Sequence, residues 1–265
     1  MLPTWDPDRL LSKIPVVLGA VGGRRMGKST LTFHLLKRMR NQFDLVISFT
    51  GTAACSPELR DLMDRHWDSR FMFPSWKPEL MERLLHQQEE LKGRGINRQV
   101  CVLVDDIIMS SRHEDSLSHL CLRGRHFNIS VMMCAVSYTT LPKRSRRSLD
   151  TLFLFSMPMA GDIQILTQEY AQNSSMARYL VQRLPKWTCL VMETLTPQQR
   201  LYHYTSNGGE EPQTPESQSD APDETSASDE TLLRNHDASH PQETNEASGH
   251  IGSEENPESP CEEKS

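Results

Sequence analysis

The sequence has few cysteines, no long apolar run and no recognisable leader segment. Its six cysteines form neither a C-x-x-C pair nor a Cys/His spacing typical of a metal site, which argues against a zinc-stabilised fold. Most of them lie within apolar runs, where a free thiol packs as a small apolar side chain, and this usage indicates a reducing, intracellular setting. No run approaches the roughly 18 apolar residues of a membrane span, and the N-terminal segment lacks the features of a signal peptide. We therefore expect a soluble protein that is not secreted and has no membrane partner.

Aromatic residues are absent from the last part of the chain, which also has almost no β-branched aliphatic residues. From Asn207 onward there are 16 acidic residues and two basic ones, so this part carries a charge of −14 while the first 206 residues carry +8. Such a composition cannot bury enough apolar area to offset the entropy of ordering the chain. The composition predicts one folded domain over residues 1–206 and a disordered acidic tail over residues 207–265.

The folded part alternates short apolar runs with segments of helical period, which is the pattern of a parallel sheet flanked by helices. We find no internal repeat. The predicted strands are 14–21, 43–49, 99–108, 129–138 and 151–157, followed by an antiparallel pair, 187–194 and 200–205. The predicted helices are 28–40, 57–66, 78–92, 115–126, 162–171 and 176–184. The fold class is therefore α/β with a mainly parallel sheet.

The best-defined motif is G-x-x-x-x-G-K-S, which runs from Gly22 to Ser29 as GGRRMGKS. It follows an apolar strand and opens a helix, as a phosphate-binding loop requires; the alternative is a glycine-rich turn with a lysine at a helix start. Glycines let backbone N–H groups converge on a β-phosphate, Lys28 reaches the β- and γ-phosphates, and the Ser29 hydroxyl ligates Mg²⁺. We therefore predict a P-loop ATPase domain that binds ATP and Mg²⁺. The residues expected to contact the nucleotide are Gly22, Gly23, Arg24, Arg25, Met26, Gly27, Lys28, Ser29 and Thr30.

Two aspartates end the apolar run VCVLVDDI. A P-loop site needs one carboxylate at the end of a neighbouring strand to hold the metal, and often a second acid to polarise the attacking water. Asp105 fits the first role and Asp106 the second, although many motor ATPases carry the longer glutamate at the second position. A turn after a buried strand is the alternative interpretation, because Asp is common there.

Two groups of arginines are candidates for stabilising the charge on the transferred γ-phosphate. Arg123 and Arg125 follow a predicted helix, whereas Arg144, Arg146 and Arg147 lie in the predicted basic loop LPKRSRRS. Such an arginine is often supplied in trans by a neighbouring subunit. For any single one of them, a solvated basic loop or a DNA-facing patch is an equally good interpretation.

The positive charge of the first 206 residues suits contact with the phosphates of DNA, which is the sequence-independent part of DNA binding. The segments KRSRRS and GRGINR carry part of this charge in predicted loops. The acidic tail would then either compete with DNA for this surface or serve as a docking arm.

Taken together, residues 14–155 resemble the poxvirus-type viral DNA-packaging ATPases of the FtsK–HerA P-loop lineage, which also occur in large DNA viruses and Polinton-like elements. The resemblance rests on GGRRMGKST, on FTGT after the second strand, on LVDDI, and above all on RGRHFNISVMMCAVSYTTLPKRSRRSLDTLFLF. It implies a RecA-like (ASCE) core that forms a homo-oligomeric ring around double-stranded DNA and drives it into a preformed capsid, with a capsid or portal-vertex protein as partner. It also implies action in the nucleus or at a cytoplasmic assembly site of an infected cell, or in association with the virion. By the same analogy Arg125 or Arg146 would be the trans arginine.

One position departs from the family pattern. Family members usually carry a γ-phosphate-sensing glutamine before the S-Y pair, where this chain has Val136, on a strand expected beside the Asp105 strand. The sensing role then passes to Ser137 or Thr140, or hydrolysis is weak. The alternatives to a motor are therefore a P-loop interaction protein with weak or no hydrolysis, or a P-loop small-molecule kinase in which LPKRSRRS forms the lid. A GTPase is disfavoured because no N/T-K-x-D segment is present.

Overall fold

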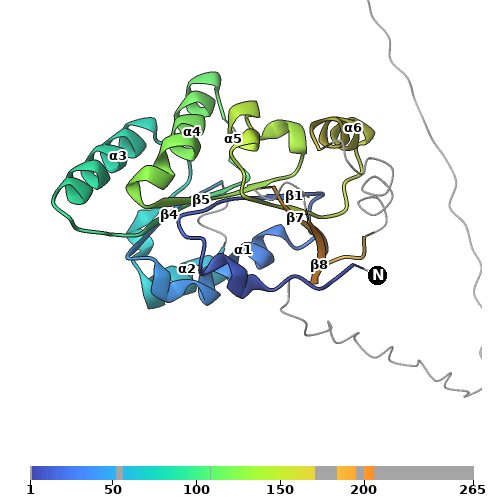
Figure 1. The fold of residues 1–265 in the computed structure, drawn as a ribbon, viewed down its shortest axis with the longest axis horizontal. Helices are drawn as coiled ribbons and strands as arrows, with labels where there is room; N and C mark the ends of the chain where they lie inside the picture. Colours follow the sequence, from blue (N-terminus) through green and yellow to red (C-terminus); the bar gives the residue numbers. More distant parts are fainter. Residues whose placement is uncertain (1, 52–55, 108, 171–183, 195–199, 206–265) are drawn as a thin grey trace, which may run out of the picture. The chain divides into compact units, whose positions relative to one another are not determined.

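A computed structural model describes the chain over residues 2–51, 56–107, 109–170, 184–194 and 200–205. These residues form a twisted sheet with helices on both faces, as Figure 1 shows. The strands are β1 (Val17–Val21), β2 (Leu45–Thr50), β3 (Met72–Phe73), β4 (Val100–Asp105), β5 (Ile129–Ala135), β6 (Thr151–Leu154), β7 (Thr188–Glu193) and β8 (Leu201–Thr205). The α-helices are α1 (Lys28–Arg38), α2 (Pro57–His66), α3 (Pro78–Gly93), α4 (Ser111–Arg123), α5 (Lys143–Arg147) and α6 (Ala160–Glu169). Short 3₁₀ helices occupy Pro7–Leu10, Arg40–Gln42, Ser69–Phe71, Gly124–Phe127 and Tyr138–Thr140.

The strand order in the sheet is β3-β2-β4-β5-β1-β6-β7-β8. The strands from β3 to β6 pair in parallel, and only the β6–β7 and β7–β8 pairs of the described sheet are antiparallel. This confirms the predicted mainly parallel sheet. Strand β5 lies between β1 and β4, so the strand ending in aspartates is the neighbour of β5, as expected.

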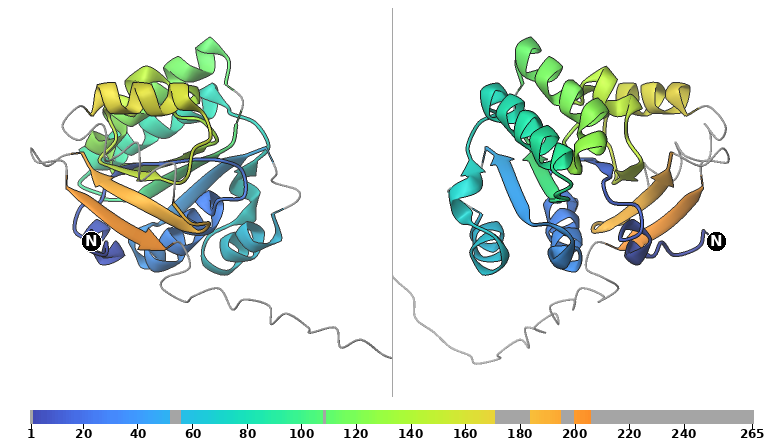
Figure 2. Two further views of the ribbon diagram at one scale, coloured as in Figure 1. Left: turned by 90° about the vertical axis from the view of Figure 1, so that its right-hand side faces the viewer. Right: turned by 60° about the vertical axis from the view of Figure 1, so that its left-hand side comes forward.

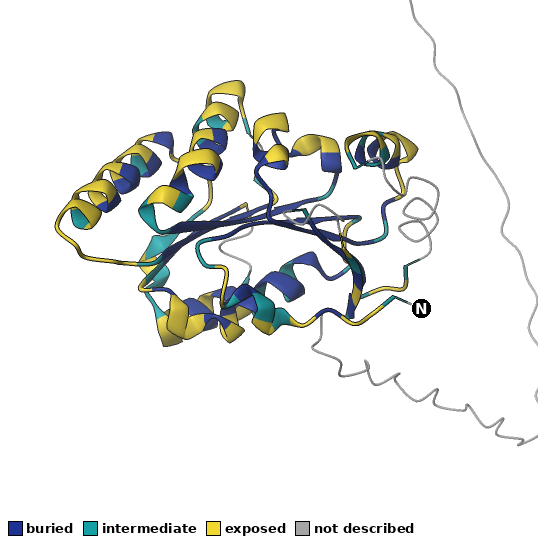
Figure 3. Cartoon of the chain, in the orientation of Figure 1, coloured by how far each residue is buried: buried dark blue, intermediate teal, exposed yellow. Residues whose placement is uncertain are grey.

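Both faces of the sheet are covered, which explains why its strands are apolar at consecutive positions. Helices α1 and α2 lie on one face, and α3, α4, α5 and α6 lie on the other, an arrangement that the turned views in Figure 2 also show. In β1, Val17 and Val21 pack in one apolar cluster, while Leu18 and Ala20 pack in the other. Figure 3 shows the consequence: the strands between β3 and β8 are buried almost along their whole length, and the helices expose their outer sides.

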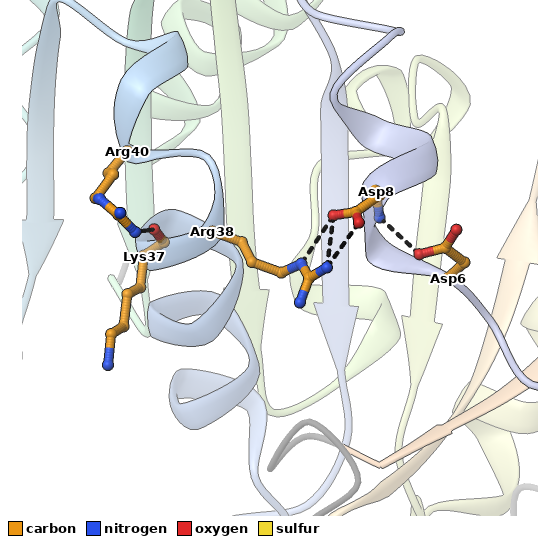
Figure 4. A network of polar contacts seen from close by, with 5 residues as sticks. All are labelled: Asp6, Asp8, Lys37, Arg38 and Arg40. Carbon is orange, nitrogen blue, oxygen red and sulfur yellow. Dashed lines mark hydrogen bonds and ion pairs between the residues drawn. The ribbon is translucent and has the colours of Figure 1, made fainter.

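A 3₁₀ helix near the N-terminus, Pro7–Leu10, packs beside the end of α1. The Arg38 guanidinium donates to both carboxylate oxygens of Asp8, with N–O distances of 2.7 to 2.9 Å (Figure 4). Both side chains are largely solvent-exposed, so this ion pair contributes little to stability. Trp5 and Leu10 are buried in the core, and Arg9 donates to the Tyr202 hydroxyl at 2.6 Å, so apolar burial and a further polar contact also attach this segment.

Three features differ from the sequence-based expectation. The predicted loop LPKRSRRS contains the short helix α5, whose Ser145 and Arg146 are buried; five residues are too few to show a helical period. The two-residue strand β3 was not predicted, for the same reason of length. The predicted strand 129–138 ends at Ala135, because a 3₁₀ helix begins at Tyr138. The predicted helix 176–184 and the tail 207–265 lie outside the described residues, apart from Leu184.

Within the described residues, no helix combines the length and apolar character needed to cross a membrane.

Candidate nucleotide site

The loop between β1 and α1 has the backbone conformation of a phosphate cradle. Gly27 caps α1 with φ of 108°, and Arg25 has φ of 60°, so the chain turns sharply twice before the helix. Gly22 is required for a different reason: a Cβ there would lie 2.5 Å from the Cβ of Phe155. The start of the loop is fastened to the sheet, because the Gly22 N–H donates to the Ala135 carbonyl and the Gly23 N–H to the Ser156 carbonyl. No side chain caps the first turn of α1, which leaves its N–H groups available to an anion.

Lys28, the first residue of α1, is buried and folds back over this loop. Its ammonium donates to the carbonyl oxygens of Gly22 at 2.9 Å and Gly23 at 3.0 Å. Among the described residues, the hydrogen bonds of this buried ammonium go to carbonyl oxygens, and it can exchange them for phosphate oxygens.

Ser29 and Asp105, predicted from distant parts of the sequence, meet at the end of β4. The Ser29 hydroxyl donates to Oδ2 of Asp105 at 3.1 Å. Asp105 is only 7% exposed, and burial raises the pKa of its carboxyl above the ordinary value. The negative charge of Asp106 raises this pKa further, whereas hydrogen bonds from Ser29 and Cys134 and the charge of Lys28 lower it in part.

This pair fits a divalent cation. The second carboxylate oxygen of Asp105, Oδ1, is buried and has no hydrogen-bond partner among the residues that the structure describes. An unpartnered buried carboxylate oxygen costs free energy unless a cation or a donor compensates it. A hydroxyl and a carboxylate are also the oxygen ligands that Mg²⁺ takes in phosphate sites.

Asp106 occupies a turn and faces solvent beside a cavity. Its φ of 48° lies in the left-handed region, and its N–H donates to the Cys134 carbonyl at 3.2 Å. The cavity has a volume of about 440 Å³ and is lined by Arg24 of the P-loop and by residues at the ends of β4 and β5, in α4 and just before α5. Among the lining residues are Arg24, Asp106, Glu114, Val136 and Thr140. Asp106 therefore shares a cavity with Arg24 of the P-loop, and its role in orienting water stays a prediction.

The remaining residues of the predicted nucleotide loop lie around the same turn. Arg24 and Arg25 are exposed, and only Arg24 lines the cavity. Met26 is half-buried, and its carbonyl accepts from the Trp187 N–H at 3.1 Å. Thr30 lies in the first turn of α1 and lines a separate groove between α1 and α2.

Arg125, one of the two candidate trans arginines, has a partner in its own chain. Its Nη1 donates to Oδ1 of Asp150 at 2.9 Å, while Oδ2 of this buried aspartate accepts from the N–H of Val17. Val17 is the first residue of β1, and the P-loop follows the last one. Arg125 therefore lies at the end of β1 that is opposite the P-loop.

Arg146, the other candidate, is 8% exposed and packed under α6. It forms an ion pair with Glu169 at 3.2 Å, donates to the Tyr138 carbonyl at 3.2 Å, and lies over the Tyr138 ring. The structure brings neither Arg125 nor Arg146 to the cavity beside the P-loop, and each is held by a buried or half-buried partner. Their role as trans arginines stays a prediction.

The end of β5 presents an apolar side chain where a sensor was expected. Val136 lines the cavity, but the Ser137 hydroxyl donates to Asp162 at 2.8 Å and is buried. Thr140 also lines the cavity, and its hydroxyl donates to the Ser137 carbonyl at 2.7 Å. Of the two polar candidates, only Thr140 therefore borders the space beside the P-loop.

Two residues of the site were not predicted. Cys134 on β5 contacts the Thr32 hydroxyl of α1 at 3.0 Å and is the register partner of Asp105 on β4, so it lies between the helix and the Ser29–Asp105 pair. Glu114 in the first turn of α4 adds a second carboxylate to the cavity. The apolar run of β5 gave no hint of Cys134; the pairing of Cys134 with Asp105 appears only once the strand order is known.

Comparison with known proteins agrees with this geometry. The model of the poxvirus A32 protein family matches residues 6–183. No curated protein matches the chain in sequence.

Solved structures share the fold at low sequence identity. The DNA-packaging ATPase B204 from Sulfolobus turreted icosahedral virus has a TM-score of 0.52 and 14% identity, over 72% of this chain and 97% of that one. The ATPases 2 and 3 of EssC from Geobacillus thermodenitrificans have a TM-score of 0.51 and 16% identity, over 75% of this chain and 41% of that one. The cytoplasmic domain of the type VII secretion ATPase EccC from Thermomonospora curvata has a TM-score of 0.51 and 13% identity, over 72% and 24%. Because the family model covers well over half of the chain, the chain belongs to the poxvirus A32 protein family.

Proposed function

We propose that this protein hydrolyses ATP in the presence of Mg²⁺ and uses the reaction to move double-stranded DNA into a viral capsid. The observation that carries the proposal is the contact of Ser29 with Asp105 beneath a complete P-loop. Membership of the A32 family, and a fold shared with a protein described as a DNA-packaging ATPase, support the choice of DNA as the moved substrate.

Each residue of the site has a role that follows from its position. The N–H groups of the first turn of α1 bind the phosphates, and Lys28 transfers its two hydrogen bonds from loop carbonyls to phosphate oxygens. Asp106, at the mouth of the cavity, accepts a proton from the water that attacks the γ-phosphate.

Magnesium would be held by Ser29 and the free oxygen of Asp105, and it would neutralise charge on the phosphate oxygens when bound. The contact of Cys134 with Thr32 supports this pair, because Cys134 is the register partner of Asp105 and Thr32 belongs to α1.

The DNA contact is proposed on the face that carries α5. Lys143, Arg144 and Arg147 of this helix are exposed, and the preceding residues Leu141 and Pro142 line the cavity. A phosphate backbone bound here would lie within one short helix of the nucleotide, which gives hydrolysis a direct route to DNA. Assembly as a homo-oligomeric ring, a capsid or portal partner, and action inside an infected cell complete the proposal.

The decisive measurement is ATP hydrolysis by the purified protein with and without double-stranded DNA, with Lys28→Ala as control. Hydrolysis that rises on addition of DNA and disappears in the variant supports a translocating motor.

A second candidate is a protein whose assembly is gated by nucleotide without turnover. It is favoured by Val136 at the sensor position and by the engagement of Ser137 with Asp162. ATP that binds tightly but is not hydrolysed under either condition supports this candidate and rejects the motor.

A further inference from the structure

Arg24, the third residue of the P-loop, differs from the arginines considered so far. Its side chain is exposed and lines the cavity beside Asp106. Unlike Arg125 and Arg146, it makes no hydrogen bond or ion pair with any residue that the structure describes. A guanidinium that lines a cavity and has no partner among the described residues has its donors available to a ligand.

The charges around this cavity suit an arginine that meets a phosphate. Asp106 and Glu114 line the same space as Arg24, so the cavity lining holds one arginine and two acidic residues. The P-loop itself carries Arg24, and the loop is fastened to the sheet through Gly22 and Gly23. The loop that leads into the first turn of α1 therefore also carries a side chain that lines the cavity.

We propose that Arg24 acts in cis as the arginine that stabilises the γ-phosphate during hydrolysis, a role that rests on the ATPase function proposed above. In this step the oxygen of a water molecule forms a bond to the γ-phosphorus as the bond to the bridging oxygen of ADP breaks. The water proton passes to Asp106, and the guanidinium of Arg24 hydrogen-bonds the γ-phosphate oxygens on which charge develops. The products are ADP and inorganic phosphate, and no further reactant is needed.

An exposed arginine away from the cavity provides the control. Arg60 of α2 is exposed, and it lines neither this cavity nor the groove between α1 and α2. Both arginines are replaced by asparagine. For Arg24→Asn we expect kcat to fall by about 100-fold or more, with ATP affinity within about threefold of wild type. Arg60→Asn should keep kcat within about threefold. Arg24→Lys, which keeps the charge without the planar fork, should give an intermediate rate.

A mixing experiment separates action in cis from action in trans. Arg24→Asn subunits are mixed with Lys28→Ala subunits, which keep Arg24 but no longer carry the lysine that engages ATP. If Arg24 acts in cis, the mixture has no more activity than the sum of its parts. Recovered activity in the mixture, or an Arg24→Asn protein with kcat within about fivefold of wild type, overturns the inference. A loss confined to ATP affinity, with normal kcat at saturating ATP, also overturns it.

Failure of the function and failure of the inference give different results. A wild-type protein without ATPase activity rejects the proposed function, and the inference with it. An active wild type with an equally active Arg24→Asn variant rejects the inference alone.

Discussion

Gly22 is the point at which the P-loop leaves the sheet, and no side chain fits there. A Cβ at this position would lie 2.5 Å from Phe155 Cβ and 3.2 Å from its backbone, which cannot move aside as a side-chain end can. We expect Gly22→Ala to lower the free energy of unfolding by about 1–3 kcal/mol and to weaken ATP binding. Urea unfolding of the purified protein measures the first effect.

The adjacent glycine is the control for this substitution. A Cβ at Gly23 would meet its nearest neighbour, the Met26 side chain, at 3.5 Å, which is ordinary contact. Gly23→Ala should therefore unfold at nearly the wild-type urea concentration; equal losses for both variants would contradict the steric argument.

Substitutions at the two adjacent aspartates should affect different steps, one the binding of ATP with Mg²⁺ and the other its hydrolysis. Asp105→Asn removes the carboxylate that Ser29 contacts, so we expect the Mg²⁺ dependence of ATP binding to weaken. Asp106→Asn leaves that contact intact and should keep ATP affinity while lowering kcat by about 10²–10⁴-fold. Titration with a fluorescent ATP analogue at several Mg²⁺ concentrations, beside steady-state hydrolysis, distinguishes the two. If Asp106→Asn hydrolyses ATP at the wild-type rate, Glu114 becomes the leading candidate for the acid that orients water.

Among the elements, the 3₁₀ helix Gly124–Phe127 contacts the sheet region through an ion pair. Arg125 meets Asp150, whose other oxygen accepts from the first N–H of β1. Arg125→Ala leaves the buried carboxylate of Asp150 without its cation. We expect the free energy of unfolding to fall by about 1–2 kcal/mol near pH 8. This is less than for a fully buried ion pair, because the arginine is partly exposed to solvent.

The pH dependence of that loss has a definite sign. Burial raises the pKa of Asp150 above its ordinary value, and the Val17 N–H, Arg125 and Lys13 lower it in part. The folded state therefore binds this proton more readily than the unfolded state, so the charged carboxylate costs stability that is regained as pH falls through the raised pKa. The loss in the free energy of unfolding caused by Arg125→Ala should therefore be smaller at about pH 5 than at about pH 8. Urea unfolding at both values checks this; a constant deficit would contradict it, and the exposed Arg123→Ala is the control.

The elements visible in the sequence are those with enough residues to show a period or a motif. The P-loop and the strand ending in Asp105 and Asp106 were predicted because glycine spacing and an apolar run are local signals. Helix α5 and strand β3 were missed because five and two residues carry no period. Cys134 was missed because its meaning depends on β5 lying between β1 and β4, which is a long-range property of the sheet.

For the whole molecule, the test of function is the salt dependence of DNA binding. Replacing Lys143 and Arg147 of α5 by alanine should weaken binding to all duplex sequences alike. The slope of log affinity against log salt should fall by about one for each phosphate that the variant no longer neutralises. Fluorescence anisotropy with two unrelated duplexes at several salt concentrations measures both effects.

A pair from the opposite face of the sheet serves as control for this experiment. Lys37 of α1 and Arg60 of α2 are also exposed, and their helices lie on the other side of the sheet. Their replacement by alanine should leave the slope nearly unchanged; an equal fall in slope would mean that DNA is not bound preferentially at α5.

The two borders of the described sheet limit how copies of this protein can join. At one border β3 has only two residues, and at the other β8 is met by Thr4, which forms a bridge with His203. Neither border, as far as the described residues extend, presents a long row of unpaired backbone groups on which a second copy could extend the sheet. If copies assemble into the ring proposed above, their contacts would then be made by side chains of helices and loops. Contacts of that kind can be broken and re-formed at each round of hydrolysis without breaking backbone hydrogen bonds between strands.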